Sequence, residues 1–173
     1  KAQAAIRDPL WSRGLGDVYK RQLLPVIIFC LSAGHSYANE SNTLKSLMEN
    51  RSCIECNLSR LNLGLHDLQR VDLSGANLSD SYLVNVDLSN ANLSNSDLSN
   101  TYMNGANLSA TKLVETDFEG AELELANFNQ AIFINVNLVG AYLLHAAISE
   151  EQLNNAKLCK TVLPDANTSY RDC

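Results

Sequence analysis

Large apolar residues occupy every fifth position from Leu58 to Leu158, and no insertion breaks the register. The stretch from Asp87 to Asn100, DLSNANLSNSDLSN, shows how an Asp or Asn followed by Leu returns every five residues. A helix repeats at 3.6 residues and a strand at 2, so neither element alone explains this period. We therefore predict that the chain turns a corner once per repeat and that four repeats close a square coil. Residues 20 apart would then stack about 4.8 Å from each other, which is one strand spacing.

A second column of smaller residues precedes the large one by two positions, as at Val71, Ala76 and Thr101. Small side chains there predict a second inward position with less room. The residue between the two columns is usually Asn or Asp, and it must point outward because neighbours in an extended segment face opposite sides. The 20 Asn residues also indicate many turns, since Asn tolerates left-handed backbone geometry.

Three segments carry the motif A-[DN]-L-x-x intact: Ala76-Asn77-Leu78, Ala91-Asn92-Leu93 and Ala106-Asn107-Leu108. On these residues the sequence resembles the pentapeptide-repeat family, over residues 56–160. The resemblance implies an all-β fold, a right-handed quadrilateral β-helix that forms a solenoid of about five coils.

The first 38 residues differ in character from the repeats. Residues 1–22 include SRGLGDVYKRQ, which resembles a translated sequencing adapter, so we interpret them as an artefact; a genuine basic leader is the alternative. Residues 23–38 combine a short apolar run with small residues near Ala38, which predicts a truncated signal peptide, although a buried core helix would also fit. We therefore expect a periplasmic or extracellular location, or an equivalent lumen, and no membrane anchor after cleavage near Ala38.

Both ends of the repeat region carry sequences that could close it. Residues 39–52 place Leu44 and Leu47 at helical spacing, so we expect an N-terminal helical cap. The repeat domain follows over residues 53–160. Residues 161–173 contain a Pro-Asp turn signal, and we expect this tail to cover the other end.

Four cysteines follow the predicted signal peptide, in an oxidising compartment if the protein is exported. Their spacing favours two local disulfides, Cys53–Cys56 and Cys159–Cys173, one at each end of the repeats; the two other connectivities stay open. A redox-active Cys53-x-x-Cys56 would need a helix after the first cysteine, where a coil is expected instead. Zinc bound by Cys53, Cys56 and His66 would lack a fourth ligand.

Charge and ligand chemistry exclude some classes of function. Without residues 1–38 the chain has eight basic and seventeen acidic residues, a net charge of about −9, which argues against direct nucleic-acid binding. A catalytic nucleophile needs a base within reach, and the two histidines beyond residue 38 are better explained as structural. They are His66, at an inward position, and His145, at a corner. We expect no enzyme and no cofactor.

Two pairs of carboxylates should stack on adjacent coils: Asp67 on Asp87, and Asp97 on Asp117. Such pairs could hold a cation through oxygen ligands. A solvated outer face broken up by Asn explains them more simply, so we expect no metal site.

Three tyrosines, Tyr82, Tyr102 and Tyr142, hold the outward position at separations of 20 and 40 residues, so we expect them on one face. Asn62 begins their column and Glu122 interrupts it. Tyrosine combines apolar area with a polar tip, and this face could bind a carbohydrate or a protein partner. The alternative is an aromatic ladder that stabilises neighbouring coils and meets only water.

Outward positions turn apolar in the last coils, at Ile132, Ile134, Val139 and Leu144. A contiguous exposed apolar patch usually marks association, so these residues predict a homodimer interface through the C-terminal coils. The alternative is that the tail from Thr161 to Cys173 covers them.

These features together favour an exported, non-enzymatic protein that serves as a binding or structural scaffold, with a partner that the sequence does not identify. The alternative is an acidic DNA mimic that inhibits a type II topoisomerase, as the resemblance implies for some family members. The acidic run that suggests it comprises Glu115, Asp117, Glu119, Glu122 and Glu124.

Overall fold

The computed structural model of the 173-residue chain describes Leu44, Lys45 and residues 47–173. The chain divides into two compact units, Lys1–Tyr37 and Ala38–Cys173, and only the second contains described residues. The predicted adapter segment and signal peptide therefore lie outside the described residues.

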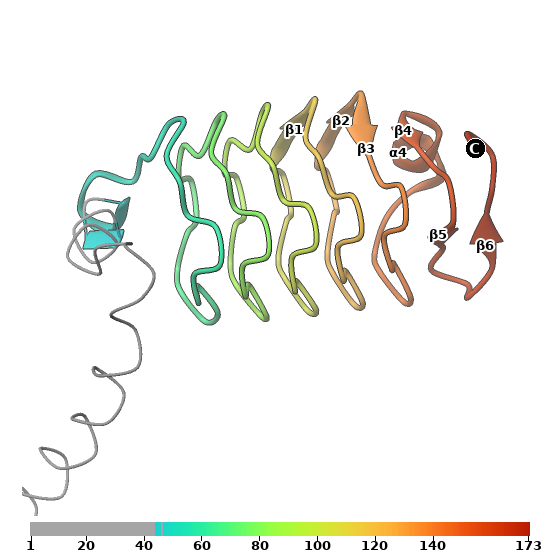
Figure 1. The fold of residues 1–173 in the computed structure, drawn as a ribbon, viewed down its shortest axis with the longest axis horizontal. Coiled ribbons are helices and arrows are strands. Elements are labelled where there is room, and N and C mark those ends of the chain that lie inside the picture. The colour runs from blue at the N-terminus through green and yellow to red at the C-terminus, as the bar shows by residue number, and fades with distance from the viewer. Residues whose placement is uncertain (1–43, 46) are drawn as a thin grey trace, which may run out of the picture. The chain divides into compact units, whose positions relative to one another are not determined.

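Residues 52–162 wind into coils that stack along the chain direction (Figure 1). Parallel bridges join residues 20 apart, as in Ser52 with Asp72 and Tyr142 with Val162. Two main-chain hydrogen bonds form the bridge between Asp72 and Asn92: Leu73 N–H donates to Asn92 O at 2.9 Å, and Asn92 N–H donates to Val71 O at 2.9 Å. The predicted stacking of residues 20 apart is confirmed.

Corners separate the sides of each coil. Ala76 N–H donates to Leu73 O at 3.0 Å, which closes a tight turn, and Gly75 at the third position has φ +68°. Left-handed geometry of this kind suits Gly and Asn. Of the positive-φ positions in the described residues, five are Asn and four are Gly, which explains part of the Asn enrichment.

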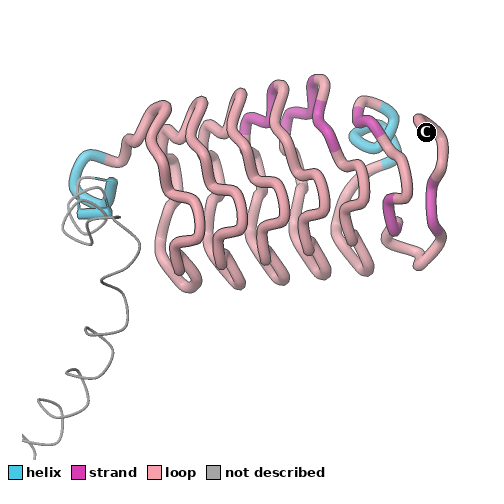
Figure 2. Tube along the Cα trace, viewed as in Figure 1, coloured by secondary structure: helices cyan, strands magenta, loops and turns pink. Residues whose placement is uncertain are grey.

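Most sides of the coils carry isolated bridges rather than long strands (Figure 2). The named elements are β1 (Lys112–Val114), β2 (Ile132–Ile134), β3 (Val136–Asn137), α4 (Glu150–Asn154), β4 (Ala156–Lys157), β5 (Thr161–Val162) and β6 (Thr168–Ser169). β1 pairs with β2 and β3 with β4 in parallel, whereas β5 and β6 form an antiparallel hairpin.

The interior is built from the two inward columns. Nineteen of the 21 large residues from Leu58 to Leu158 are buried, and Ile148 and Leu153 are half-buried. The smaller column fills the remaining space, with Ala76 and Thr101 fully buried. Thr101 Oγ1 donates to Leu98 O at 2.7 Å and Thr116 Oγ1 to Leu93 O at 2.8 Å, whereas the buried Ser81 hydroxyl has no hydrogen-bond partner among the described residues.

The repeat is interrupted just after Ile148, and Leu153 lies within the interruption. The predicted register continues through residues 149–153, but the structure has α4 there, so the repeat domain is interrupted within the predicted range 53–160. Ser149 and Gln152 form a capping box: Ser149 Oγ accepts from Gln152 N–H, and Gln152 Oε1 accepts from Ser149 N–H. This local signal outweighs a single five-residue period.

Both ends of the coil stack are covered. Leu44, Lys45 and residues 47–50 are helical, Leu47 is fully buried, and Leu44 packs on the core. At the other end the hairpin of β5 and β6 brings Cys173 back to Cys159 (Figure 1).

Candidate binding surfaces

The tyrosine column lies on one face, where each member bridges to the residue 20 positions on. Asn62 pairs with Tyr82, Tyr82 with Tyr102, Tyr102 with Glu122, and Glu122 with Tyr142. The side chains stay accessible: Tyr82 is 48% exposed, Tyr102 47% and Tyr142 38%. The structure therefore brings all three predicted tyrosines onto one side of the stack.

The rings do not form one flat platform. The centroids of Tyr82 and Tyr102 are 6.3 Å apart, with 36° between the ring planes. The Tyr82 ring lies close to Gly64 of the first coil: a Cβ added at Gly64 would be 3.3 Å from the ring. Glu122 separates Tyr102 from Tyr142, and Asn104 Nδ2 donates to its carboxylate at 3.1 Å.

Tyrosine is an unusual choice at this position, as the other sides of the coil show. Asp72 Oδ1 accepts from Ser74 N–H at 3.0 Å, and Asp87 Oδ1 accepts from Ser89 N–H at 2.9 Å. Asp and Asn thus satisfy a donor in the following turn. A tyrosine such as Tyr82 has no oxygen within reach of that donor. The tyrosine column therefore lacks the hydrogen bond between side chain and turn N–H that Asp and Asn supply on other sides, so stabilisation of the turn does not explain these tyrosines.

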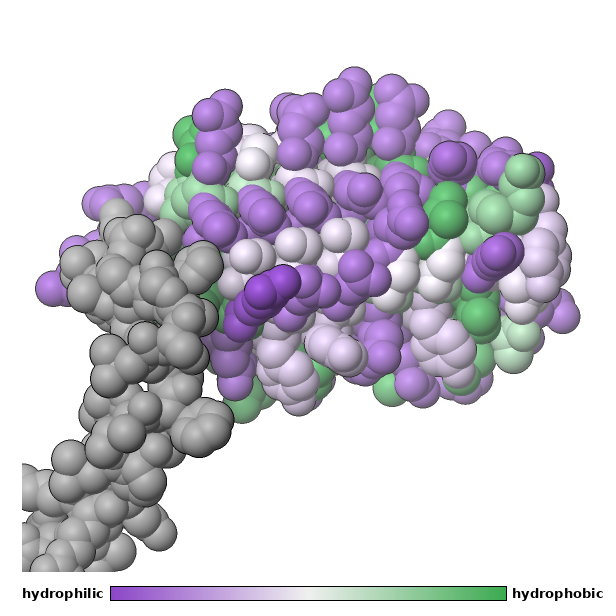
Figure 3. Space-filling model, viewed as in Figure 1, coloured by the Kyte–Doolittle hydropathy of each residue, from purple (hydrophilic) through white to green (hydrophobic). Residues whose placement is uncertain are grey.

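The rows of Asp and Asn on other sides form ladders between coils. Asn107 Nδ2 donates to Asp87 Oδ1 at 3.1 Å, and Asn137 Nδ2 donates to Asp117 Oδ1 at 2.9 Å. Figure 3 shows hydrophilic side chains in rows that cross successive coils. These ladders are regular, polar and water-facing.

The carboxylate pairs stack as predicted, with bridges from Asp67 to Asp87 and from Asp97 to Asp117. Nearby donors use their oxygens: the pKa of Asp67 is lowered, first by the N–H of Gln69 and then by the Arg51 guanidinium, whose Nη2 lies 3.3 Å from Oδ2. Within residues 44, 45 and 47–173 no group of three or more His, Cys, Asp or Glu could hold a metal ion.

The structure contains the disulfides Cys53–Cys56 and Cys159–Cys173. Each joins residues close in sequence, three and fourteen positions apart, at opposite ends of the coil stack. His66, the third residue of the zinc alternative, is half-buried, and its Nδ1 lies 3.0 Å from Gly64 O.

The four residues of the predicted dimer interface do not form one patch. Ile134, Val139 and Leu144 lie beside three successive turns, at Asn135, Gly140 and His145, and so at different corners. Val139 and Leu144 are also partly buried. The tail leaves Ile132 and Ile134 53% and 48% exposed, so only these two remain as a local apolar surface.

The acidic run also winds around the coil instead of lining one face. Asp117 lies on the side that bridges to Asn137, whereas Glu122 lies on the tyrosine side. Glu115 and Glu124 lie near other corners of the same coil. Its charges therefore point in several directions.

Sequence reasoning missed Gln152, although its spacing from Ser149 could have been recognised as a capping box. In earlier coils an outward residue donates its main-chain N–H to the preceding coil, as Asn127 does to Ala106 O. α4 displaces the chain at this point, and Gln152 Nε2 instead donates to Phe128 O at 2.8 Å and Ala131 O at 2.9 Å. A side-chain amide thus replaces the main-chain N–H donor that the next coil would have supplied.

Two hollows open on either side of this replacement. The larger, of about 780 Å³, is lined by residues 133–137 and 154–157 together with Arg171 and Asp172. The smaller, of about 350 Å³, is lined by residues 129–133, Ser149, Glu151, Gln152 and Asn155. Among the described residues no helix is long and apolar enough to cross a membrane.

The family model for pentapeptide repeats matches residues 52–90, 81–120, 111–146 and 121–158, with eight copies. These segments cover more than half of the chain, and the chain therefore belongs to the pentapeptide-repeat family. None of the curated proteins compared with the chain matches it.

Solved structures show the same relationship. A pentapeptide repeat protein, Rfr23 from the cyanobacterium Cyanothece 51142, is 30% identical with a TM-score of 0.57, and the match covers 75% of this chain and 98% of that one. HetL from Nostoc sp. strain PCC 7120, described as involved in heterocyst differentiation regulation, is 27% identical over 73% of this chain and 60% of its own, with a TM-score of 0.39. QnrB1, a plasmid-mediated fluoroquinolone resistance protein, is 15% identical over 55% of this chain and 54% of its own, with a TM-score of 0.46. The last two similarities carry no functional argument.

Proposed function

We propose that this protein is an exported, non-enzymatic scaffold whose right-handed quadrilateral β-helix presents a protein-binding surface. Export is supported by the apolar segment within residues 23–38 and by a disulfide at each end of the coil stack, since disulfides persist in oxidising compartments. Quadrilateral geometry is supported by turns at five-residue intervals and bridges at 20-residue intervals.

The observation that carries the proposal is the exposed tyrosine column. Tyr82, Tyr102 and Tyr142 replace the Asp or Asn that would stabilise the following turn, and their rings remain partly in solvent. Tyrosine is enriched among the residues that dominate protein interfaces. Burial of these rings against a partner would offset the turn contacts that the column lacks.

A protein partner fits this face better than a long carbohydrate chain does. The tilt of 36° between Tyr82 and Tyr102, and the charged Glu122 after them, interrupt the flat stacking surface that successive sugar rings would use. A protein surface can instead match the rings with separate pockets and the carboxylate with a donor.

The test is capture of partners from the source organism's periplasm with the purified chain. We expect Tyr82→Ser combined with Tyr102→Ser to weaken partner binding by about five- to thirtyfold, the effect of losing about one to two kcal/mol of binding, and to reduce the captured protein accordingly. Tyr170→Ser, which removes a 66% exposed tyrosine from the tail, is the matched control. If the double variant melts at a lower temperature but captures every partner unchanged, the tyrosines are only a structural ladder.

Location is tested separately from binding. When the chain is expressed from an added start codon, we expect the mature protein to begin at Asn39, as measured by N-terminal sequencing of the exported product. Retention of residues 23–38 in that product would contradict the signal peptide. Recovery in the cytoplasm, together with gyrase inhibition, would support the DNA-mimic alternative, although the dispersed acidic run does not favour it.

A further inference from the structure

The sheet of β1 and β2 ends in an unpaired edge. Ile132 N–H donates to Thr111 O at 2.9 Å, and Ile134 O accepts from Glu115 N–H at 2.8 Å, so the main chain of both residues faces β1. Successive residues of a strand direct their main-chain groups to opposite sides. The N–H and C=O of Phe133 therefore point away from β1, and no third strand of the described chain joins this sheet.

The edge has no strand partner because the chain leaves the coil as α4 at this point. Gln152 Nε2 satisfies Phe128 O and Ala131 O, which precede the edge. From Phe133 onward the strand borders the hollow of about 780 Å³, and the smaller hollow adjoins its other end. The space beside the main chain is thus open to a ligand.

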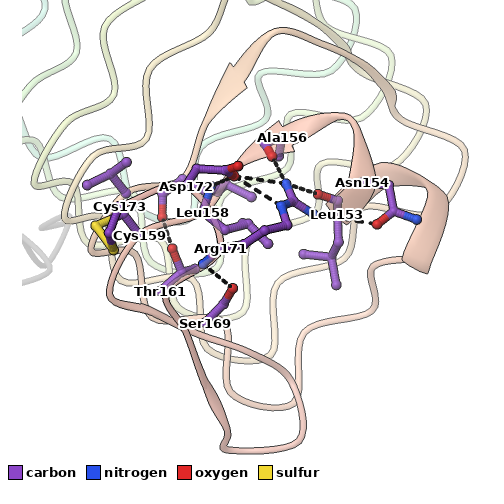
Figure 4. Close-up of polar contacts among 12 residues, drawn as sticks. Leu153, Asn154, Ala156, Leu158, Cys159, Thr161, Ser169, Arg171, Asp172 and Cys173 are labelled. Carbon is purple, nitrogen blue, oxygen red and sulfur yellow. Dashed lines mark hydrogen bonds and ion pairs between the residues drawn. A yellow bond between two sulfur atoms is a disulfide. The ribbon is translucent and has the colours of Figure 1, made fainter.

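Arg171 lines the larger hollow, and Figure 4 shows its contacts with the neighbouring segments. Its guanidinium donates to Leu153 O at 3.2 Å and to the Asp172 carboxylate at 3.1 Å, and it also contacts Ala156 O. These contacts join the tail to the end of α4 and to β4. The hollow is therefore a built feature of the C-terminal end.

Lys157 adds a second positive charge to the hollow, although it lies near enough to Asp172 to help lower the pKa of that carboxyl. It lines the larger hollow and is exposed, and it takes part in none of the ion pairs within 4.0 Å among the described residues. Arg171 beside it is already paired with Asp172. The charged residues that line the hollow are thus two cations and one carboxylate, a local excess of positive charge in a chain of net charge −6, and this favours an acidic ligand.

We propose that this edge binds an extended, acidic peptide segment of a partner protein by strand addition to β2. The Phe133 main chain would pair with the peptide backbone, Ile132 and Ile134 would contact its apolar side chains, and Lys157 would pair with a carboxylate. Main-chain bonds give affinity in this mode, and side chains on alternate positions give specificity. This site is independent of the tyrosine face.

The experiment is selection of binders to the purified chain from a displayed library of random decapeptides. We expect enriched peptides that contain an acidic residue, lack proline at the paired positions and bind with a Kd below about 100 μM. Ile134→Asp should weaken them at least about tenfold, whereas Leu125→Asp, at another exposed turn, should not. Lys157→Gln should also weaken them several-fold, with Lys160→Gln as its control.

A second readout locates the bound peptide without relying on these variants. Amide NMR should show shifted and more protected Phe133 and Asn135 N–H groups on binding. Peptide binding should persist in the chain with Tyr82→Ser and Tyr102→Ser, which separates this site from the tyrosine face. Failure to enrich peptides, binding that survives both Ile134→Asp and Lys157→Gln, or self-association that blocks the edge would overturn the proposal.

Discussion

The middle coils and the C-terminal end of the stack are held together in different ways. Each middle coil repeats one set of contacts: a buried large residue, a main-chain bond to the next coil and a turn closed by Asp or Asn. At the C-terminal end the contacts occur once each, through Gln152, Arg171 and the Cys159–Cys173 disulfide. Repetition is enough for the interior because neighbours cover it on both sides, whereas an end needs side chains specific to that place.

The largest contrast should come from removing one large side chain in each region. Leu98→Ala leaves a cavity in the fully buried column and should lower the free energy of unfolding by about 3 kcal/mol. Leu153→Ala, at a half-buried position of α4, should cost about 1 kcal/mol or less, because less apolar area is lost. Urea unfolding followed by circular dichroism measures both. Equal losses would mean that α4 contributes as much to the stack as a coil does.

The next contrast concerns the disulfide that closes the tail. Replacing Cys159 and Cys173 by Ser should lower the local stability of residues 161–173 by about 2–3 kcal/mol, as expected for a loop of this length. Hydrogen exchange should show loss of protection at Val162, in β5, and unchanged protection at Leu98 in the middle. The matched double variant removes the Cys53–Cys56 disulfide. That disulfide closes a much shorter loop, so its loss should lower stability less.

A loss of protection that extends to Leu98 in the Cys159 and Cys173 variant would contradict the comparison. It would mean that the tail and the middle coils unfold as one unit. Limited proteolysis provides an independent check, because a released tail should be cleaved while the coils stay intact.

A smaller contrast tests the amide that replaces a coil. Gln152→Leu removes two hydrogen bonds to buried carbonyl groups and should cost about 1–3 kcal/mol. Gln69→Leu removes one exposed side-chain bond, to Asp87, and should cost less than about 0.5 kcal/mol. Thermal melting of both variants measures the difference. If Gln152→Leu lowers stability no more than Gln69→Leu does, water must reach Phe128 O and Ala131 O and replace the lost donor.

The middle coils could be predicted from the sequence because their rule is local. A large residue every five positions specifies the side of the coil, and a step of 20 specifies the neighbour, as at Tyr82 and Tyr102. The same rule, applied to Ile134 and Val139, places these two residues at different corners, so it does not predict a single patch. The tyrosine face was thus predictable, and the position of Ile134 and Val139 at different corners could have been predicted from the same spacing.

The C-terminal end could be predicted only in part. Leu153 stays in the five-residue register although it lies in a helix, so periodicity alone gives no warning. The Ser149 and Gln152 capping signal was readable, but the carbonyls that Gln152 reaches depend on the position of the preceding coil. Arg171 binds Leu153 O from 18 residues away, a contact set by how the tail folds and by no repeated pattern.

The smallest contrast is in pH dependence. The pKa of Asp172 is lowered, first because its carboxylate accepts the Leu158 N–H, at 2.8 Å. A folded-state pKa below the ordinary value of about 3.9 contributes stability that is present above that value and is lost as pH falls through the folded-state pKa. Acidification from about pH 5 to below about pH 3 should therefore loosen the tail at Leu158.

Hydrogen exchange at Leu158, measured by NMR across this range, checks the prediction, and Asp172→Asn should remove most of the pH dependence there. Asp72, in a middle coil, also has a lowered pKa, first because of the Ser74 hydroxyl, so its turn should weaken over a similar window. There the adjacent coils hold the main chain, and Leu73 N–H still donates to Asn92 O. We expect Leu73 to keep its protection while Leu158 loses it. Equal loss at both amides would show that acid weakens the whole stack, and that the end is no more dependent on single contacts than the middle.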